Sequence, residues 1–263
     1  MGRRRAPFDR VAELYDRARP TYPPQLIDDL AALIPARGRV LEIGPGTGQA
    51  TLPLAERGFT IVAVELGPAL AAIARTNLAA HPDVEIVTAD FEEWEPVHAD
   101  FDAIVSFTAF HWIDPDLKYE KCARLLRPGG LLAIAGNTDI LVEGGDPIWI
   151  ELQEDYDAVV PSPDNRPPPY EDEVGDLRGE VDATGLFADV DVKRYPWAVE
   201  YSAAELCDVL RTYSPNIERD TETTERLVGR IAARIGDRTV TKHYLAMLTL
   251  ARTIVAPRGT KLE

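Results

Sequence analysis

Short apolar runs alternate with stretches of helical spacing between residues 39 and 135. The runs are rich in Val, Ile and Leu, which is typical of strands buried on both faces of a parallel sheet. The stretches between them have the composition and spacing of helices. We therefore expect an α/β fold in which strands and helices take turns. The predicted strands are 40–43, 60–64, 84–88, 101–107 and 131–135, and the predicted helices are 50–57, 68–79 and 117–126.

The pattern changes on both sides of this alternating region. Before it, Phe8, Val11, Leu14 and Tyr15 follow helical spacing, and prolines separate them from a second amphipathic run at 25–34. These residues predict a helical segment, 8–34, ahead of the first strand. After the region, residues 137–184 predict an insertion, helical over 147–160 and irregular through a proline-dense stretch at 161–170. The tail predicts strands at 190–201 and 240–254 and helices at 203–212 and 224–235.

A glycine-rich turn at 39–49, RVLEIGPGTGQ, joins the first predicted strand to the first helix. Glycine permits positive φ and lets a ligand approach the backbone, and the helix start offers unpaired N–H groups. The dinucleotide fingerprint needs a sixth-position glycine, but that position is Gln49 or Thr51. A Walker loop needs a lysine, and none lies near. The alternative is that the turn only connects the strand to the helix and binds no ligand.

The remaining pattern is an acid followed by three spaced glycines: Glu42, then Gly44, Gly46 and Gly48. A carboxylate at this place would repel a pyrophosphate and would suit a cationic ligand that carries an amino group. The pattern resembles the first motif of the class I S-adenosylmethionine-dependent methyltransferases. The resemblance implies S-adenosylmethionine as the cofactor, bound by these four residues. It also implies a Rossmann-like, doubly wound seven-stranded sheet, mostly parallel with an antiparallel last strand.

Further residues fit the same resemblance in order and spacing. Glu65, at the carboxyl end of the second predicted strand, is placed to accept hydrogen bonds from both ribose hydroxyls, with Leu66 beside it. Asp90 follows the third strand, where the family binds the adenine amino group, and Phe91 would pack on the ring or belong to the core. Thr108 follows the fourth strand and should face the reacting methyl. Arg-Pro-Gly-Gly at 127–130 is a further hallmark, with the glycines serving as turn residues.

The N-terminal pattern that includes Tyr15, Arg19 and Tyr22 is common in small-molecule members of the family. By this resemblance residues 8–34 form a helical lid over the cofactor, with Tyr15 as a contact, although Tyr15 and Tyr22 could equally be core. The insertion 137–184 lies where the family varies its substrate cover; a passive crossover is the alternative. We expect one methyltransferase domain over 1–263.

The amino-acid composition limits the classes of partner that the protein is expected to bind. The formal net charge is −16, from 28 basic and 44 acidic residues, so the overall field repels a phosphate backbone and a nucleic-acid substrate is not expected. No apolar run is long enough to suggest a membrane span or a secretory leader. Two unpaired cysteines, Cys122 and Cys207, and four scattered histidines predict a cytoplasmic protein with no metal site. The oligomeric state is not readable from the sequence.

The loop 108–114 after the fourth strand carries Phe110, His111 and Trp112. It resembles the subgroup that methylates small carboxylic acids such as trans-aconitate and its relatives acting on secondary metabolites. His111 is the candidate general base if the acceptor is a hydroxyl or an acidic carbon; a carboxylate acceptor needs none. His111 could instead only shape the pocket. Two other functions stay open: a non-catalytic binding protein with this fold, and a nicotinamide oxidoreductase.

Overall fold

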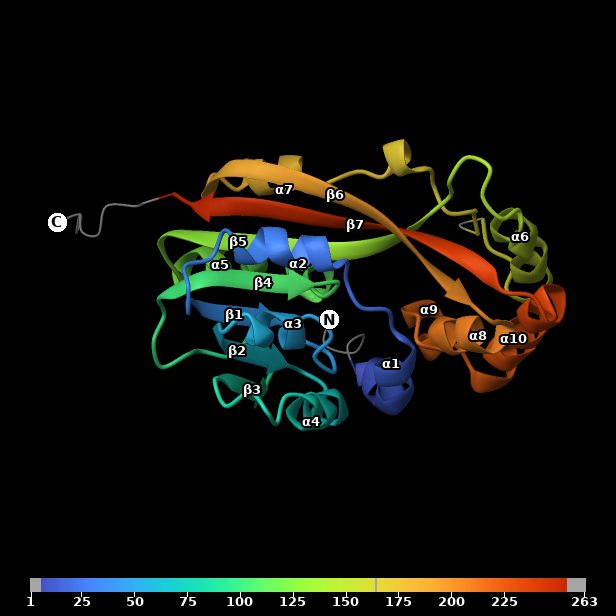
Figure 1. Cartoon of the computed structure of the whole chain (residues 1–263), viewed down its shortest axis with the longest axis horizontal. Coiled ribbons are helices and arrows are strands. Elements are labelled where there is room, and N and C mark those ends of the chain that lie inside the picture. The colour runs from blue at the N-terminus through green and yellow to red at the C-terminus, as the bar shows by residue number, and fades with distance from the viewer. Residues whose placement is uncertain (1–5, 164, 255–263) are drawn as a thin grey trace.

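The computed structural model of the chain describes residues 6–163 and 165–254. One seven-stranded sheet forms its centre (Figure 1). The strands are β1 (Arg39–Ile43), β2 (Thr60–Glu65), β3 (Val84–Thr88), β4 (Phe101–Phe107), β5 (Leu126–Ile140), β6 (Phe187–Tyr201) and β7 (Val240–Thr253). Their order is β3-β2-β1-β4-β5-β7-β6; β1 to β5 pair in parallel, and β7 is antiparallel to both β5 and β6. The predicted sheet with an antiparallel last strand is confirmed.

Helices cover both faces of the sheet and one of its ends (Figure 1). The α-helices are α1 (Ala12–Ala18), α2 (Pro24–Ala31), α3 (Thr51–Glu56), α4 (Pro68–Asn77), α5 (Pro115–Leu125), α6 (Ile148–Val159), α7 (Arg178–Ala183), α8 (Ala203–Arg211), α9 (Ser214–Glu218) and α10 (Thr221–Ile235). Three 3-10 helices join them: η1 (Ala6–Val11), η2 (Phe110–Trp112) and η3 (Glu171–Glu173).

Successive residues of the central strands point to opposite faces, and both faces are buried. Val40 of β1 packs in the cluster under α2 and α3, whereas Leu41 packs in the cluster under α5 and α7. This explains why the strands read as continuous apolar runs. Helices therefore cover both faces of the sheet. The carboxyl ends of the parallel strands stay uncovered by these helices, and a binding site can form there.

A third apolar cluster lies beyond the ends of β6 and β7, and we call it the cap cluster. It joins α6, α8 and α10 to the tips of those strands (Figure 1). The predicted insertion 137–184 does not coincide with it. Only α6 of that segment belongs to the cap cluster, because Val181 of α7 packs on the sheet face instead. Helices α8 and α10, which the sequence placed in the tail, complete the cap cluster.

The predicted lid 8–34 also divides in two. Helix α2 packs on the sheet face through Leu26, Ile27 and Leu30. Helix α1 instead contacts α4 and α8, so it bridges the sheet's end and the cap cluster. Residues 8–22, which we call the N-terminal segment, are therefore the part that lies at the carboxyl edge of the sheet.

Strand β5 is longer than the apolar run 131–135 predicts. It begins at Leu126 and bulges at 127–130, since its partner moves only from Phe101 to Ala103 while β5 advances from Leu126 to Leu131. It then continues to Ile140. This polar extension forms because β7 pairs along it, Asn137 with Ala246 and Asp139 with Tyr244.

Candidate active site

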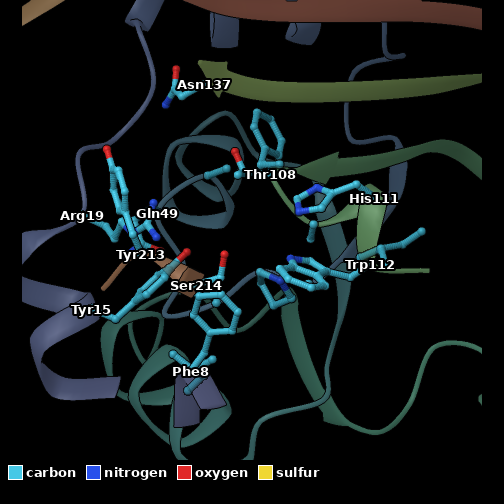
Figure 2. A pocket seen from close by; sticks show the side chains of 18 of the residues that line it. Phe8, Tyr15, Arg19, Gln49, Thr108, His111, Trp112, Asn137, Tyr213 and Ser214 are labelled. Carbon is cyan, nitrogen blue, oxygen red and sulfur yellow. The ribbon is translucent and has the colours of Figure 1, made fainter. Parts of the chain in front are cut away.

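A cavity of about 640 Å³ opens at the carboxyl ends of β1, β2, β4 and β5 (Figure 2). Its volume lies within the range of small-molecule sites, roughly 300–1,000 Å³. The N-terminal segment contributes Phe8, Tyr15 and Arg19 to its wall, and the loop before α9 contributes Tyr213. The site therefore lies where ligands of open parallel sheets bind.

The glycine turn forms one wall of the cavity. Gly44 has φ of +68° and Gly46 has φ of +61°, a region that side chains rarely adopt. A Cβ on Gly44 would stand 2.5 Å from the Cβ of Ala109, and one on Gly46 would stand 3.3 Å from the ring of Tyr15. The turn thus lets β4's loop and the N-terminal segment approach the backbone closely.

Gly48 is the one predicted cofactor residue that does not line the cavity. Its φ is +101°, and a Cβ there would contact Leu78 at 3.3 Å, behind the turn. Its N–H donates to the carbonyl of Pro45 at 3.0 Å. Gly48 therefore shapes the turn from behind the cavity wall, and its predicted contact with the cofactor stays a prediction.

Replacing Gly44 with alanine is expected to lower the free energy of unfolding by about 2–5 kcal/mol, from positive φ and overpacking together. Gly185 is the matched control, because its φ is +64° and nothing lies within 4 Å of the position that a Cβ would occupy there. Gly185→Ala should cost only about 1–2 kcal/mol. Urea unfolding measures both. Equal losses would contradict the close approach of Ala109.

Glu42 is a buried carboxylate inside the cavity wall. Its side chain is fully buried, and neither oxygen has a hydrogen-bond partner within the described part of the chain. Burial raises the pKa of Glu42 to about 7; the nearby hydroxyl of Thr51, which completes no hydrogen bond among the described residues, acts to lower it, and the charge of Glu65 acts to raise it further. An unpaired buried carboxylate is costly. A cationic ligand group is the partner that would offset this cost.

Glu65 lies on the neighbouring strand with both carboxylate oxygens engaged. Oε2 accepts from the N–H of Gly46 at 3.0 Å, and Oε1 accepts from the N–H of Gly67 at 2.8 Å. Burial raises the pKa of Glu65, and these backbone donors act in the opposite direction. The carboxylate keeps further acceptor positions for ligand hydroxyls.

Asp90, Phe91 and Leu66 line the cavity next to Glu65, as the sequence predicts. Asp90 accepts from the N–H of Glu92 at 2.9 Å through Oδ1. Phe91 is also a core residue: it is buried in the cluster under α5, and the Nζ of Lys121 lies 5.1 Å from its ring centroid. Phe91 thus both lines the cavity and belongs to the core, and its packing on the adenine ring stays a prediction.

Thr108 and Tyr22 meet at the centre of the cavity. Their hydroxyl oxygens are 2.7 Å apart, and the N–H of Thr108 donates to the carbonyl of Ala135 at 2.8 Å. Thr108 has φ of +54°, which is rare for a non-glycine residue and marks a constrained position at the strand end. Tyr22 packs edge-on to Phe107 at 4.8 Å.

Arg19 is a cavity residue that the sequence placed in a pattern without assigning a contact. Its guanidinium lies between two rings, 5.1 Å from the centroid of Tyr15 and 4.7 Å from that of Tyr213 (Figure 2). One terminal nitrogen donates to the carbonyl of Thr212 at 2.7 Å. Its Nε is buried and has no partner among the described residues. This donor is available to an anionic ligand group.

His111 stands at the rim of the cavity opposite Arg19 (Figure 2). Its ring is tilted against Trp112 with centroids 4.9 Å apart, and Trp112 packs edge-on to Phe8 at 6.0 Å. Partial burial, and then the charge of Lys118, lower the pKa of His111. The imidazole is therefore neutral and able to accept a proton near neutral pH.

Several lining residues come from stretches that carry no motif, among them Asn137 and Asp139 on the β5 extension, Tyr213 before α9, and Tyr244 on β7. Only the pairing of β5 with β7 and the packing of the cap cluster bring them to the cavity. Within residues 6–163 and 165–254, no three His, Cys, Asp or Glu side chains gather as a metal site would require. No helix in the same ranges is long and apolar enough to cross a membrane.

Comparisons with known proteins give a consistent result. Residues 40–130 match the family model described as a methyltransferase domain. An uncharacterized methyltransferase of Mycobacterium tuberculosis is 37% identical over 166 residues, which are 58% of this chain and 66% of that protein. The alignment thus spans just under two thirds of that relative's length.

Solved structures share the fold over most of the chain. A protein of Anaeromyxobacter dehalogenans, described provisionally as a type II methyltransferase, has a TM-score of 0.63 and 23% identity, and the match covers 90% of this chain and 99% of that one. Phosphoethanolamine N-methyltransferase 2 of Haemonchus contortus, solved with S-adenosyl-L-methionine, has a TM-score of 0.55 and 17% identity over 94% of this chain and 57% of that one. At these identities the likeness shows the fold.

Proposed function

We propose that the protein is a class I methyltransferase that transfers the methyl group of S-adenosylmethionine to a small-molecule acceptor. The match of residues 40–130 to the methyltransferase-domain family supports the proposal. Small carboxylic acids and secondary metabolites are the acceptor classes that its loop 108–114 favours. The proposal places the reaction in the cytoplasm.

The unpartnered carboxylate of Glu42 carries this proposal. It lies in the cavity wall beside Gly44 and Gly46, so the positive group of a ligand that enters the cavity would lie close to it. The amino group of S-adenosylmethionine is such a group, whereas a pyrophosphate would be repelled. Binding an ammonium group would also favour the ionised form of Glu42, whose pKa burial raises to about 7.

The other cavity residues suit the remaining parts of the cofactor. Glu65 would accept hydrogen bonds from the ribose hydroxyls, and Asp90 would accept one from the adenine amino group. Leu66 and Phe91 would flank the ring. The unpartnered Nε of Arg19, next to Tyr15 and the glycine turn, would donate a hydrogen bond to the carboxylate of S-adenosylmethionine.

When bound, the cofactor supplies a methyl group on a positively charged sulfur. Because that charge disappears as the methyl leaves, the protein contributes chiefly by aligning the acceptor and excluding water. Thr108 and Tyr22 hold the strand end that faces the methyl. His111 would take the acceptor's proton at its unprotonated ring nitrogen when the acceptor is a hydroxyl.

The proposed cover over the site has two parts. The N-terminal segment closes one side through Phe8, Tyr15 and Arg19, and prolines 167–169 of the insertion close another. Both would exclude water from the reacting atoms. A polynucleotide acceptor is disfavoured by the net charge of −16.

Release of S-adenosylhomocysteine tests the proposal. Purified protein incubated with S-adenosylmethionine and a panel of carboxylic acids, phenols and amines is expected to release it faster with at least one acceptor than without any. Cofactor binding with no acceptor-dependent release from any class would favour a non-catalytic binding protein. Binding of a nicotinamide dinucleotide instead would favour an oxidoreductase.

A further inference from the structure

One end of the cavity is built outside the matched family region, 40–130. Asn137 and Asp139 reach it from the β5 extension, Tyr213 from the loop before α9, and Tyr244 from β7. The cofactor contacts proposed for Glu42, Glu65 and the glycine turn lie at the ends of β1 and β2, and Arg19 lies between them and this end because it contacts both Tyr15 and Tyr213. The side chains at this end, which we call the acceptor end, would therefore bind the acceptor and determine which acceptors the protein selects.

Asp139 is held in a fixed position at this end. Lys242 donates to its Oδ2 at 2.6 Å, and the hydroxyl of Tyr213 donates to Oδ1 at 3.2 Å. The side chain of Lys242 is only 5% exposed. Its Nζ lies 4.8 Å from the ring centroid of Trp149, with the rings of Tyr213 and Tyr244 within 5.5 Å.

The position of Lys242 supports a charged Asp139. Burial is the largest influence on the pKa of Lys242 and acts to lower it, but the neighbouring groups together, first among them the charge and hydrogen bond of Asp139, hold that pKa above its usual value. Lys242 is thus a cation that requires an anionic partner. Asp139 itself is 29% exposed, so its carboxylate reaches the cavity rather than being sealed in with the lysine.

The carboxylate has room for another donor. A carboxylate offers about four lone-pair sites, and Lys242 and Tyr213 donate to it from the protein side. An acceptor molecule with an O–H or N–H group could occupy a remaining position. An acceptor carboxylate would instead meet Asp139 with like charge.

The charge of the whole lining also disfavours an acceptor carboxylate. Four carboxylates line the cavity, those of Glu42, Glu65, Asp90 and Asp139, against the two arginines Arg19 and Arg166. Arg19 lies between Tyr15 and Tyr213, where it would serve the cofactor, and Arg166 is exposed. With Arg19 assigned to the cofactor carboxylate, the described lining residues of the acceptor end include no further buried cation for an anionic group.

Aromatic rings supply the apolar surface of this end. Tyr244 lines the cavity and stacks on Trp197 at 5.0 Å with an interplanar angle of 27°. Trp197 in turn donates to the Oδ1 of Asn137 at 3.2 Å. Because Tyr244 is only 2% exposed, the aromatic surface open to a flat apolar molecule comes from half-buried rings of the lining, such as those of Tyr213 and Trp112.

We propose that Asp139, held by Lys242 and Tyr213, binds the acceptor by accepting a hydrogen bond from its hydroxyl or amino group, so that the acceptor is an uncharged aromatic molecule rather than a carboxylate. The inference rests on the proposed function and selects among its acceptor classes. Asp139 is a specificity-determining residue, and Lys242 is a positioning residue that acts through it.

Four probes with the same ring test the inference: para-cresol, para-toluidine, para-toluate and para-methylanisole. Each is titrated by ligand-observed NMR into the protein saturated with S-adenosylhomocysteine. We expect the cresol and the toluidine to bind about 10-fold or more tightly than the other two, as a hydrogen bond to a charged group allows. Equal binding of all four, preference for the toluate, or binding of none would overturn the inference.

Variants of the protein then test whether Asp139 causes this preference. Asp139→Asn is expected to remove most of the preference for the cresol while the affinity for S-adenosylhomocysteine stays within two-fold. Asp155→Asn is the matched control, because Asp155 is a buried carboxylate paired with Arg230 and Arg234 that does not line the cavity. It should leave the preference intact. A preference unchanged in Asp139→Asn would contradict the role of Asp139. Failure of the unaltered protein to bind S-adenosylhomocysteine would instead contradict the proposed function.

Discussion

Replacing His111 with alanine is expected to lower kcat about 10²–10⁴-fold on a hydroxyl acceptor, which is the usual contribution of a positioned general base. The physical reason is that a hydroxyl oxygen must lose its proton as it takes the methyl group, and His111 is the neutral imidazole at the cavity rim. The affinity for S-adenosylhomocysteine should not change, since the proposed cofactor contacts lie elsewhere. Steady-state kinetics with the best acceptor of the panel, together with calorimetry, measure both quantities.

The pH dependence gives a second readout of the same residue. Because partial burial lowers the pKa of His111 from its usual value of 6.5, the base is active above that lowered pKa and is lost as it becomes protonated below it. The rate should therefore rise through a pH below 6.5 and then level off, and the rise should vanish in His111→Ala. His98→Ala, on the exposed loop before β4, serves as the control. A fully active His111→Ala enzyme would show that His111 only shapes the pocket.

Replacing Glu65 with alanine is expected to weaken binding of S-adenosylhomocysteine by about 3 kcal/mol, on the order of 10²-fold. Two losses combine in this change. The ribose hydroxyls lose a charged acceptor, and the N–H groups of Gly46 and Gly67 lose the carboxylate that holds them. Glu65→Gln keeps one acceptor oxygen and should lose less. Calorimetric titration gives each dissociation constant.

Glu85 provides the matched control for Glu65. It is exposed on the neighbouring strand β3, and it does not line the cavity. Glu85→Ala should bind S-adenosylhomocysteine as the unaltered protein does. Equal affinities for Glu65→Ala and Glu85→Ala would remove Glu65 from the cofactor site.

Local sequence signals were sufficient for the central fold. The apolar runs of β1, β2 and β4 predicted buried parallel strands because residues such as Val40 and Leu41 are buried on opposite faces, whereas β3 lies at the sheet edge with its side chains half-buried or exposed. Strand β5 exceeded its apolar run because pairing with β7 supplied backbone partners for the polar residues 136–140. No local pattern carries that information, since the partner strand lies far along the chain, at 240–253.

The candidate site also has one part that local sequence patterns predicted and one part that depends on long-range packing. Glu42, Glu65 and Asp90 belong to strand ends with a known order, so their positions followed from spacing. Asp139 and Tyr213 became neighbours only through the β5 extension and the cap cluster. The predicted segments 8–34 and 137–184 each include a helix that packs on the sheet face, α2 and α7, because a helix's own sequence does not show which neighbour its apolar residues will contact.

The central claim is that the glycine-turned, carboxylate-lined cavity binds a sulfonium nucleoside. Calorimetric titration of the purified protein with S-adenosylhomocysteine, and separately with NAD, tests it most directly. We expect one S-adenosylhomocysteine per chain with a dissociation constant on the order of 1–100 μM, equivalent to about 5–8 kcal/mol, and no detectable NAD binding. Binding of NAD without binding of S-adenosylhomocysteine would contradict the account.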